Sequence, residues 1–408
     1  MAADNTRPVL KGLRILDIAH QYSAALSAGL LADLGADVVA VEHPSRPTAA
    51  RTMIPRKDGE SLWWKVMQRN KRLVTLDLST ERGREILLEL APHFDVIVEN
   101  FRPGTLERWH LGPADLEAAG LNVVLLRVSG FGQTGPYRDR PGFGTIAEAF
   151  SGFAHLNGET TGPPTFPSTT LADGVAGTFG ALGILAAMWN RATGDAAGVQ
   201  VIDLALFEGL FRLIPIQIPT VDQLGVAPIR PGNKLTSHGA LRNLYTSRDK
   251  RNFCVSAVGT DTIRRILVAA SASELVERLD GGAMFDTNEN VITFLEKCDE
   301  RVDAWASALD YADISRALAE SGAVYQEIYS AEEIYRDPHY QARGDLVSAP
   351  DSKLGPIMMQ GVVPKFVGRE HVVSHAGPAR GTHTAEVYRD LLGMSESELD
   401  ALREQGVI

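Results

Sequence analysis

Residues 13–42 read LRILDIAHQYSAALSAGLLADLGADVVAVE, and this stretch decides the fold. Its first six residues are mostly apolar and predict a short buried strand. Ser23 is a suitable N-cap for a helix of small residues over 24–34, which Gly35 ends. Residues 37–42 predict a second strand. A strand, a helix and a second strand in this order form a β-α-β unit, which predicts parallel strands joined by a right-handed crossover.

The same alternation continues further along the chain. Strands are predicted at residues 73–76, 96–98, 123–128 and 200–203, and a helix at 81–90. This pattern predicts an α/β fold with a Rossmann-like, doubly wound parallel sheet. The first turn, DIAHQYSAALSAG, lacks the G-x-G-x-x-G fingerprint of dinucleotide-binding proteins, so neither a nicotinamide nor a flavin cofactor is expected.

Three polar loops follow the ends of predicted strands, where doubly wound sheets bind ligands. They are residues 20–23, 99–104 and 129–137, and arginines accompany the second and third of them. A further cationic group, RNKR at residues 69–72, precedes the strand at 73–76. Each group alone is compatible with an ordinary solvated surface. Together they are expected to line one edge of the sheet, and arginines beside glycines favour a phosphorylated ligand.

Residues 167–190 read PSTTLADGVAGTFGALGILAAMWN, and Asp173 is the only charged side chain among them. The small and apolar residues after it predict a helix that belongs in a core. Residues 168–170 can cap its start. A carboxylate in the first turn lies near the positive end of the helix dipole, where ionisation is favoured, and beside apolar surface. Two interpretations are open at this point: Asp173 is a nucleophile, or it only caps the helix.

A cluster of prolines between residues 215 and 231 marks a linker to a second region. Beyond it, residues 245–256 predict a hairpin, and helical patterns follow up to residue 321, which together predict a smaller α+β domain. Two helical patterns after residue 384 predict a return of the chain to the first domain. The expected organisation is a large domain over 1–215, a linker and small domain over 216–330, and a returning segment over 331–408.

The composition is that of a globular protein of 408 residues, 44% hydrophobic and 22% charged. A net charge of −11 argues against nucleic-acid binding, although an anionic ligand needs only a local cationic pocket. Cys254 and Cys298 give neither a disulfide framework nor a metal spacing, so a reducing compartment and no metal are expected. The start of the chain lacks an apolar signal-peptide segment, and the helix after Asp173 is expected to be buried. A cytoplasmic location without membrane contact is therefore predicted.

Ordered motifs run along almost the whole chain. The most specific in combination are ENFRPG at 99–104, SGFGQTGPY at 129–137 and LADGVAG at 171–177. Further motifs near the C-terminus are DPHYQARGDLV, LGPIMMQGVVPKF and GTHTAEV. With these stretches the chain resembles the family III CoA-transferases, which include formyl-CoA transferase and carnitine CoA-transferase and are related to α-methylacyl-CoA racemase. The resemblance implies an interlocked homodimer that exchanges coenzyme A between an acyl-CoA and a carboxylic acid.

The resemblance also implies roles for individual positions. The nucleophilic aspartate of the family falls on Asp173, so catalysis becomes the favoured interpretation of this residue. The residues expected to bind CoA are His20, Tyr22 and Ser23, Leu76 beside the adenine, Asn100, Phe101, and Arg108 on the phosphates. Arg102, Lys71 and Arg72 lie in matching segments and could also serve the phosphates.

In the implied reaction the side chain of Asp173 is bonded first to the acyl group and then to CoA. Its carboxylate attacks the acyl-CoA carbonyl, which gives an acyl-aspartyl anhydride and a CoA thiolate. The thiolate returns to the aspartyl carbonyl and forms an aspartyl-CoA thioester. The acceptor acid attacks this thioester, and the sequence reverses onto the new acyl group. Asp173 must be ionised, fixed in place and shielded from bulk water for this chemistry.

Two departures from the family pattern keep alternatives open. Residues 231–243, PGNKLTSHGALRN, stand where formyl-CoA transferase has a glycine-rich loop that closes over the aspartate. Phe143 and Gly144 stand where the racemase relatives have a His-Asp pair, which counts against a racemase or isomerase acting on an acyl-CoA. A non-catalytic CoA-binding subunit is the other alternative, and the presence of Asp173 counts against it.

Overall fold

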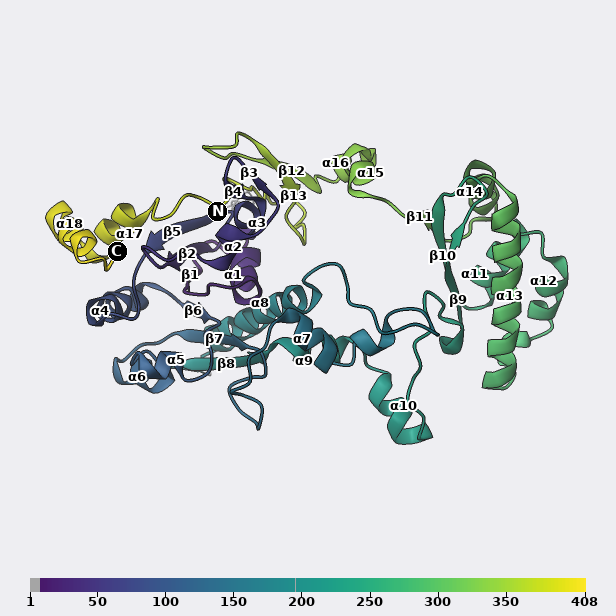
Figure 1. The fold of residues 1–408 in the computed structure, drawn as a ribbon, viewed down its shortest axis with the longest axis horizontal. Coiled ribbons are helices and arrows are strands. Elements are labelled where there is room, and N and C mark those ends of the chain that lie inside the picture. Colours follow the sequence, from purple (N-terminus) through teal and green to yellow (C-terminus); the bar gives the residue numbers. More distant parts are fainter. Residues whose placement is uncertain (1–7, 195) are drawn as a thin grey trace. The chain divides into compact units, whose positions relative to one another are not determined.

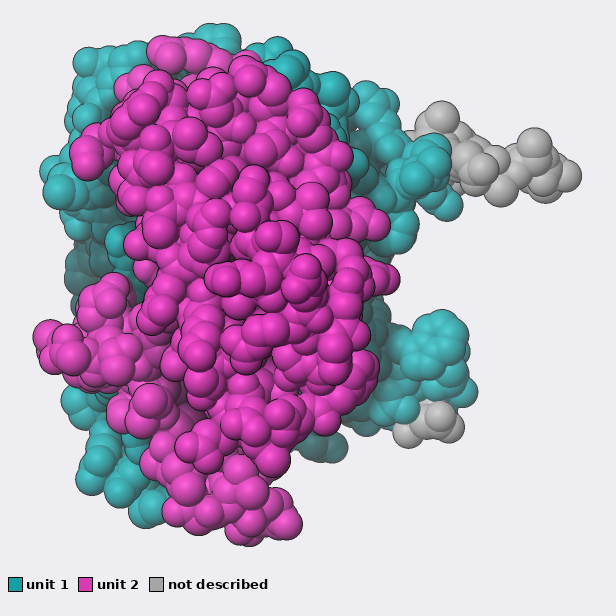
Figure 2. Space-filling model, turned by 90° about the vertical axis from the view of Figure 1, so that its right-hand side faces the viewer, with its two compact units in different colours: residues 1–153, 167–216, 338–408 teal, residues 154–166, 217–337 magenta. Residues whose placement is uncertain are grey.

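The computed structural model describes residues 8–194 and 196–408. The chain has two compact units, which Figure 2 colours separately: the first contains the chain up to 153, 167–216 and 338–408, and the second contains 154–166 and 217–337. The sequence-based division put 154–166 in the large domain. Arg230 of the second unit donates hydrogen bonds to the carbonyl oxygens of Gly162 (2.6 Å) and His155 (3.0 Å), which explains why this segment groups with that unit.

Six parallel strands form the centre of the first unit (Figure 1). In spatial order they are β5 (Lys71–Thr75), β2 (Asp37–Glu42), β1 (Arg14–Asp17), β6 (Val96–Glu99), β7 (Val124–Ser129) and β8 (Gln200–Ala205). Numbered among themselves, the strands follow the order 3-2-1-4-5-6 of the Rossmann fold. The predicted α/β class and the doubly wound parallel sheet are therefore confirmed.

Helices cover both faces of the sheet. One face packs against α1 (Tyr22–Asp33), α2 (Ala49–Thr52), α3 (Leu62–Met67), α7 (Gly144–Phe150), α8 (Leu171–Ala192) and α9 (Leu206–Leu213). The other packs against α4 (Glu81–Leu90), α5 (Thr105–Arg108), α6 (Pro113–Ala118), α17 (Thr384–Leu392) and α18 (Glu396–Glu404). Successive strand residues serve opposite faces, as Ile15 and Leu16 of β1 do. Two separate cores result, one on each side of the sheet.

Helix α8 packs on α1 through small residues. Ser27 of α1 donates a hydrogen bond from its Oγ to the carbonyl oxygen of Gly177, at 2.9 Å. A Cβ atom on Gly177 would lie only 2.8 Å from the carbonyl oxygen of Ser23, and one on Gly180 would collide with Ser27. The glycines of α8 thus permit the close approach of the two helices. They hold the first turn of α8, with Asp173, close to the N-terminal end of α1.

The expectation that α8 is buried holds for one side of the helix only. Its small residues face the core, whereas Leu182 and Trp189 are 60% and 73% exposed and Leu185 is also exposed. By length and composition α8 is also apolar enough to cross a membrane. In this fold it contacts α1, α9 and strands β7 and β8, which is the packing of a core helix with one apolar side left open.

The predicted helix caps also need correction. Helix α1 begins at Tyr22, and its N-cap is Gln21, whose extended backbone (φ −123°, ψ 165°) ends the preceding loop. Ser23 therefore lies inside the first turn and does not cap the helix. At α8 the N-cap is Thr170, and its side chain makes no capping hydrogen bond.

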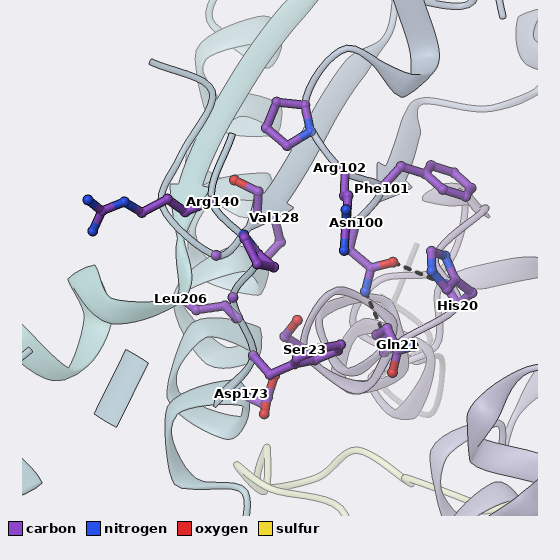
Figure 3. A pocket seen from close by; sticks show the side chains of 16 residues that line it. His20, Gln21, Ser23, Asn100, Phe101, Arg102, Val128, Arg140, Asp173 and Leu206 are labelled. Atoms are coloured by element: carbon purple, nitrogen blue, oxygen red, sulfur yellow. Dashed lines mark hydrogen bonds between the residues drawn. The ribbon is translucent and has the colours of Figure 1, made fainter. Parts of the chain in front are cut away.

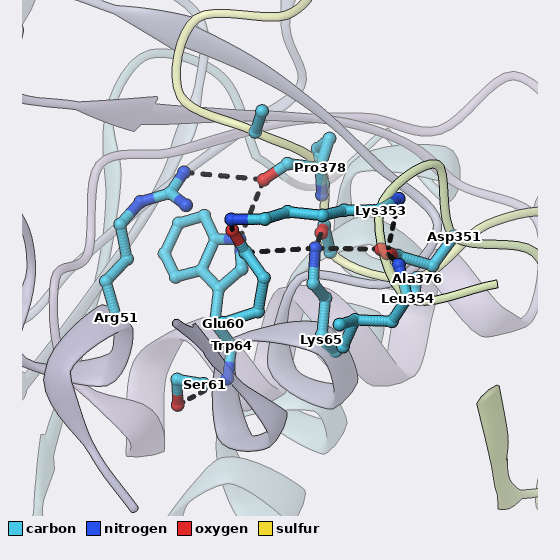
Figure 4. Close-up of polar contacts among 12 residues, drawn as sticks. Arg51, Glu60, Ser61, Trp64, Lys65, Asp351, Lys353, Leu354, Ala376 and Pro378 are labelled. Carbon is cyan, nitrogen blue, oxygen red and sulfur yellow. Dashed lines mark hydrogen bonds and ion pairs between the residues drawn. The ribbon is translucent and has the colours of Figure 1, made fainter. Parts of the chain in front are cut away.

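The returning C-terminal segment docks on α3 through buried polar contacts (Figure 4). The Nζ of Lys65 forms an ion pair with Asp351 at 2.8 Å, and both side chains are 3% exposed. Trp64 donates from its indole nitrogen to the carbonyl oxygen of Pro378 at 2.8 Å, and Arg51 stacks over the Trp64 ring at 3.6 Å. This segment carries α16 (Pro338–Ala342) and a hairpin of β12 (Leu346–Ala349) and β13 (Ile357–Gln360). A small hairpin of β3 (Arg56–Lys57) and β4 (Glu60–Ser61) precedes α3.

The second unit has its own antiparallel sheet and its own core. The predicted hairpin is formed by β9 (Ala240–Thr246) and β10 (Asn252–Val258), and β11 (Tyr325–Glu327) pairs with β10. The helices are α10 (Gln217–Leu224), α11 (Thr260–Ala269), α12 (Ser273–Asp280), α13 (Asn288–Ala308), α14 (Tyr311–Ser321) and α15 (Ala331–Arg336). Helix α10 lies in the stretch that the prolines marked as a linker.

Candidate active site

The carboxyl ends of β1 and β6 flank the point where the strand order of the sheet reverses, which is where doubly wound sheets bind ligands. Asn100, directly after β6, links the two loops at this point (Figure 3). Its Oδ1 accepts the backbone N–H of His20 at 3.1 Å, and its Nδ2 donates to the carbonyl oxygen of Gln21 at 3.2 Å. One amide side chain thereby fixes the entrance to α1.

A cavity opens beside this link and reaches Asp173. Its lining comes from the loops after β1, β6 and β7, from the first turn of α8 and from the start of α9. Six of the sequence-predicted site residues line it: His20, Ser23, Asn100, Phe101, Arg102 and Asp173 (Figure 3). Residues far apart in the sequence are thus brought together around one carboxylate.

The carboxyl group of Asp173 is largely removed from water. Burial, and secondly the negative charge of Glu148, raise the pKa of Asp173 to about 6. The sequence-based argument expected the helix dipole to favour ionisation, and in the structure these two effects outweigh it. At pH 7 a group with this pKa is still ionised in roughly nine of ten molecules. Asp173 therefore combines a usable negative charge with poor hydration, as a carboxylate nucleophile requires.

Two neighbours of Asp173 on α7 escaped the sequence analysis as site residues. A Cβ atom on Gly144 would collide with Oδ2 of Asp173, so only glycine fits there with Asp173 in this position. Glu148, one turn later, is 3% exposed and accepts the backbone N–H of Ala172 at 3.3 Å. The sequence offered no signal for Glu148, because its relation to Asp173 depends on the packing of α7 against α8.

Two polar atoms of the cavity lining are buried without a hydrogen-bond partner in the described part of the chain. They are Nδ1 of His20 and the Oγ of Ser129. Burial also lowers the pKa of His20, which favours its neutral ring. Buried polar atoms without partners are uncommon in folded proteins, so these two are available to a ligand.

A second cavity of ≈ 460 Å³ adjoins the first. It lies over the ends of β2 and β5, and its lining includes Leu76, as the sequence predicted, and also Arg46. His20, Phe101 and Arg102 line both cavities, so the two cavities adjoin along these side chains and are together called the groove. The volume of the second cavity alone lies in the range of small-molecule pockets, about 300–1,000 Å³.

Lys71 and Arg72 do not line this groove, contrary to the prediction that they bind CoA phosphates. Lys71 is fully buried, and its Nζ lies 2.7 Å from Asp17 Oδ2 and 2.7 Å from the carbonyl oxygen of Ala25. Arg72 pairs with Asp37 at 2.7 Å, at the amino ends of the strands. The groove lies at their carboxyl ends. A cluster that is contiguous in sequence was thus split between the core and the opposite edge of the sheet.

Tyr22 and Arg108 lie at the margin of the groove. The Tyr22 ring packs edge-on against Trp63 with centroids 5.6 Å apart, and burial and the charge of Asp173 raise the pKa of its hydroxyl. Arg108 is exposed and donates from Nη2 to the Oγ1 of Thr105 at 2.9 Å. Thr105 itself lines the second cavity, so Arg108 stands behind its rim.

Comparison with known proteins gives this geometry a context. A family model described as CoA-transferase family III matches residues 10–384. The chain belongs to this family. It is therefore an enzyme that transfers CoA, and the resemblance drawn from its motifs is confirmed.

Curated relatives support the same family over the full length of the chain. A succinyl-CoA–D-citramalate CoA-transferase of Chloroflexus aurantiacus is 36% identical over 98% of both chains. The succinyl-CoA–L-malate CoA-transferase beta subunit of that organism is 34% identical over the whole of both chains. A formyl-CoA:oxalate CoA-transferase of Streptomyces avermitilis is 28% identical over 98% of this chain and 99% of its own.

Solved structures show the same fold at lower sequence identity. A CAIB/BAIF family protein from Brucella suis has a TM-score of 0.79 and 24% identity, covering 95% of this chain and all of its own. Rv3272 from Mycobacterium tuberculosis has a TM-score of 0.78 and 23% identity, covering 94% and 99%. These structures show that one shared fold extends over nearly the whole chain.

Proposed function

We propose that this CoA-transferase works by covalent catalysis on Asp173, through an acyl-aspartyl anhydride and an aspartyl-CoA thioester. The observation that carries the proposal is the position of Asp173: it is a poorly hydrated carboxylate with a raised pKa in the lining of the first cavity of the groove. Asp173 is the one acidic residue among the described residues in the lining of the first cavity. A carboxylate in such surroundings is exposed to the substrate and weakly competed for by water.

The groove suggests how an acyl-CoA binds. The adenine end lies in the second cavity beside Leu76, and the thioester reaches Asp173 in the first. Arg102 lines both cavities and is suited to the phosphates between them, with Arg108 behind the rim. The unpartnered Nδ1 of His20 and Oγ of Ser129 face the path of the pantetheine chain and thioester. Asn100 and Phe101 hold the loop geometry of this path.

Gly144 argues against the racemase alternative. The racemase relatives carry a His-Asp pair at Phe143 and Gly144, and here a side chain at position 144 would occupy the space of the Asp173 carboxylate. With Asp173 in this position, the chain is arranged for attack by a carboxylate. A non-catalytic subunit would not need the buried carboxylate that this chain keeps.

The relatives indicate the class of acid. The names of the first two pair succinyl-CoA with D-citramalate or L-malate, and each of these acids has a second carboxylate. We infer that this enzyme also exchanges CoA between short dicarboxylic acids. CoA enters as a substrate, and the proposed chemistry requires no metal, nicotinamide or flavin.

The enzyme is further proposed to act as a cytoplasmic, interlocked homodimer that needs neither nucleic acid nor membrane. The exposed apolar side of α8, with Leu182, Leu185 and Trp189, supports a second copy as the missing cover. The two cysteines are unpaired, as expected in a reducing compartment.

Replacement of the proposed nucleophile tests this function. Asp173→Asn keeps the size of the side chain and removes the charge. We expect a folded protein that still binds acyl-CoA and has lost transfer activity by several orders of magnitude, because the covalent route is closed. CoA transfer from succinyl-CoA to a panel of dicarboxylic acids, followed by mass spectrometry, measures this. An asparagine variant with near-normal transfer would refute the proposal.

A further inference from the structure

Glu148 is a second carboxylate in the immediate surroundings of Asp173. It lies on α7 one turn after Gly144, whose backbone is pressed against the Asp173 carboxylate. Its side chain is 3% exposed, and its Oε1 accepts the backbone N–H of Ala172, the residue before Asp173. Within the described residues no lysine or arginine forms an ion pair with it. The negative charge of Glu148 is therefore felt by Asp173 through apolar surroundings, where charges interact more strongly than in water.

Other ionisable groups on the packed elements are engaged elsewhere. Helix α7 contacts α8 and α9, and α8 contacts α1, β7 and β8. Their ionisable groups are Tyr22 and Asp33 on α1, Arg127 on β7, Arg191 on α8, Asp203 on β8, and Glu208 and Arg212 on α9. Tyr22 faces Asp173 as a neutral phenol whose pKa is raised by burial and by Asp173. Asp33 pairs with Arg69, and Arg127 pairs with Glu99. Arg191, Asp203 and Glu208 bond to backbone groups, and Arg212 is exposed.

We propose that Glu148 is a positioning residue that favours the covalent aspartyl intermediates by repelling the free Asp173 carboxylate. This inference rests on the function proposed above. In the step concerned, the acyl-CoA C–S bond breaks and a bond forms between the acyl carbon and an oxygen of Asp173. The CoA thiolate then forms a C–S bond to the aspartyl carbonyl, and the acyl group leaves as a carboxylate. The negative charge of Asp173 thus ends on the released acid, and the repulsion by Glu148 is relieved.

Protonation of Asp173 relieves the same repulsion, because it also neutralises the carboxylate. The effect of Glu148 on proton binding and its effect on the adduct equilibrium therefore have one origin. Removal of the Glu148 charge is therefore expected to lower the proton affinity of Asp173 and the equilibrium constant for adduct formation by the same factor. A side chain that only supported the fold would produce no such correspondence.

The variant Glu148→Gln tests the inference, because glutamine keeps the size and can still accept the Ala172 N–H. Succinyl-CoA is the probe, and intact-protein mass spectrometry gives the equilibrium constant between free enzyme plus succinyl-CoA and the aspartyl-CoA adduct plus succinate. The pH dependence of the rate of adduct formation gives the ionisation of Asp173. We expect the adduct constant to fall about tenfold for each pH unit by which the acidic limb moves to lower pH.

Glu208→Gln is the control, because it also removes a carboxylate from a helix that packs on α7, in this case an exposed one, and keeps the cap on Ala205. It should leave both quantities unchanged. If Glu148→Gln does not fold, Glu148→Asp, which keeps the charge but withdraws it, should give a smaller change of the same sign in both. The inference would be overturned by a folded variant whose acidic limb stays at the wild-type pH and whose adduct constant stays within twofold of the wild-type value. Absence of any adduct in the wild type would instead refute the proposed function.

Discussion

At the scale of the residue, the proposed mechanism depends on a carboxylate whose surroundings disfavour its charged form. Asp173 is placed beside Glu148 and away from water, and both conditions raise its pKa. A folded-state pKa above the value in the unfolded chain means that the native protein binds this proton more tightly. Stability is therefore lost as the pH rises from the ordinary value of 3.8 through about 6. Functional placement of Asp173 destabilises the fold at neutral pH.

Asp173→Asn should consequently stabilise the protein at neutral pH while abolishing transfer. The rise of the Asp173 pKa to about 6 sets an upper limit of about 3 kcal/mol for the gain in unfolding free energy at pH 7 to 8. Below about pH 4 both side chains are neutral, and the two proteins should be equally stable. Thermal unfolding of both proteins across this pH range measures the difference. A variant that is less stable than wild type at pH 8 would contradict the proposed environment of Asp173.

Cationic residues near the groove make a second prediction at this scale. Arg102→Ala and Arg108→Ala should each weaken binding of an acyl-CoA, because each is proposed to meet a phosphate. One charge-assisted contact is worth roughly 1.5 to 3 kcal/mol, or about tenfold to hundredfold in affinity. Arg72→Ala is the matched control, since Arg72 pairs with Asp37 at the opposite edge of the sheet. Calorimetry measures all three, and an unchanged affinity removes the arginine concerned from the site.

At the scale of the element, the contact between α1 and α8 positions the nucleophile. Both helices are built from small residues, and glycines of α8 let its axis approach α1 closely enough for the Ser27–Gly177 hydrogen bond. Strand β1 and helix α1 set the loop with His20, and α8 sets Asp173. Their spacing thus determines the width of the cavity between these groups.

Two alanine substitutions in α8 should have opposite effects on stability. A Cβ on Gly177 would lie 2.8 Å from the Ser23 carbonyl oxygen, so Gly177→Ala forces the helices apart and should cost about 1 to 3 kcal/mol. Gly174 has no neighbour within 4 Å of its Cβ position, so Gly174→Ala should be neutral or stabilise by up to about 1 kcal/mol. Denaturant unfolding compares them. Equal stability of the two variants would show that α1 and α8 are not closely packed.

The strands and long helices could be predicted from the sequence because their signals are local. The alternation in residues 13–42 defines β1, α1 and β2 without reference to the rest of the chain. Helix α7 carries no such signal: its seven residues are half apolar, and their meaning comes from contact with α8 and α9. For the same reason the loops after the strands could be predicted as ligand-binding, whereas Glu148 could not.

Lys71 illustrates the opposite error. It stands between two cationic neighbours in the sequence, Arg69 and Arg72, and such a cluster suggests a solvated or phosphate-binding surface. Its side chain instead runs beneath α1 to Asp17, where it is fully buried in an ion pair. A strand residue points to one face or the other according to its register, and the register of β5 against β2 becomes known only from the sheet.

At the scale of the whole molecule, the chain leaves apolar surface exposed. Leu182, Leu185 and Trp189 follow one another at helical spacing along the outer side of α8. Isolated exposed apolar residues are ordinary, but a contiguous stripe on a central helix marks an interaction surface. A second copy of the chain is the cover that we propose.

The protein should therefore be a dimer of twice 44.1 kDa in solution. Because an interlocked dimer cannot separate without opening, light scattering should give the same mass at every dilution, with no folded monomer. Trp189→Glu places a charge on the exposed stripe and should reduce the yield of soluble dimer. Phe285→Glu, at an exposed aromatic residue outside α8, is the control. A monodisperse monomer of the wild-type protein would contradict the assembly.

The central claim is that Asp173 carries the transferred groups covalently. Wild-type enzyme is incubated with succinyl-CoA without acceptor acid, treated with hydroxylamine, digested and analysed by peptide mass spectrometry. An aspartyl anhydride or thioester is converted into a hydroxamate, which marks the side chain that carried it. The account predicts a hydroxamate on Asp173 that requires succinyl-CoA and is absent from Asp173→Asn. A hydroxamate on Glu148 or another residue, or none in an enzyme that transfers CoA, would contradict it.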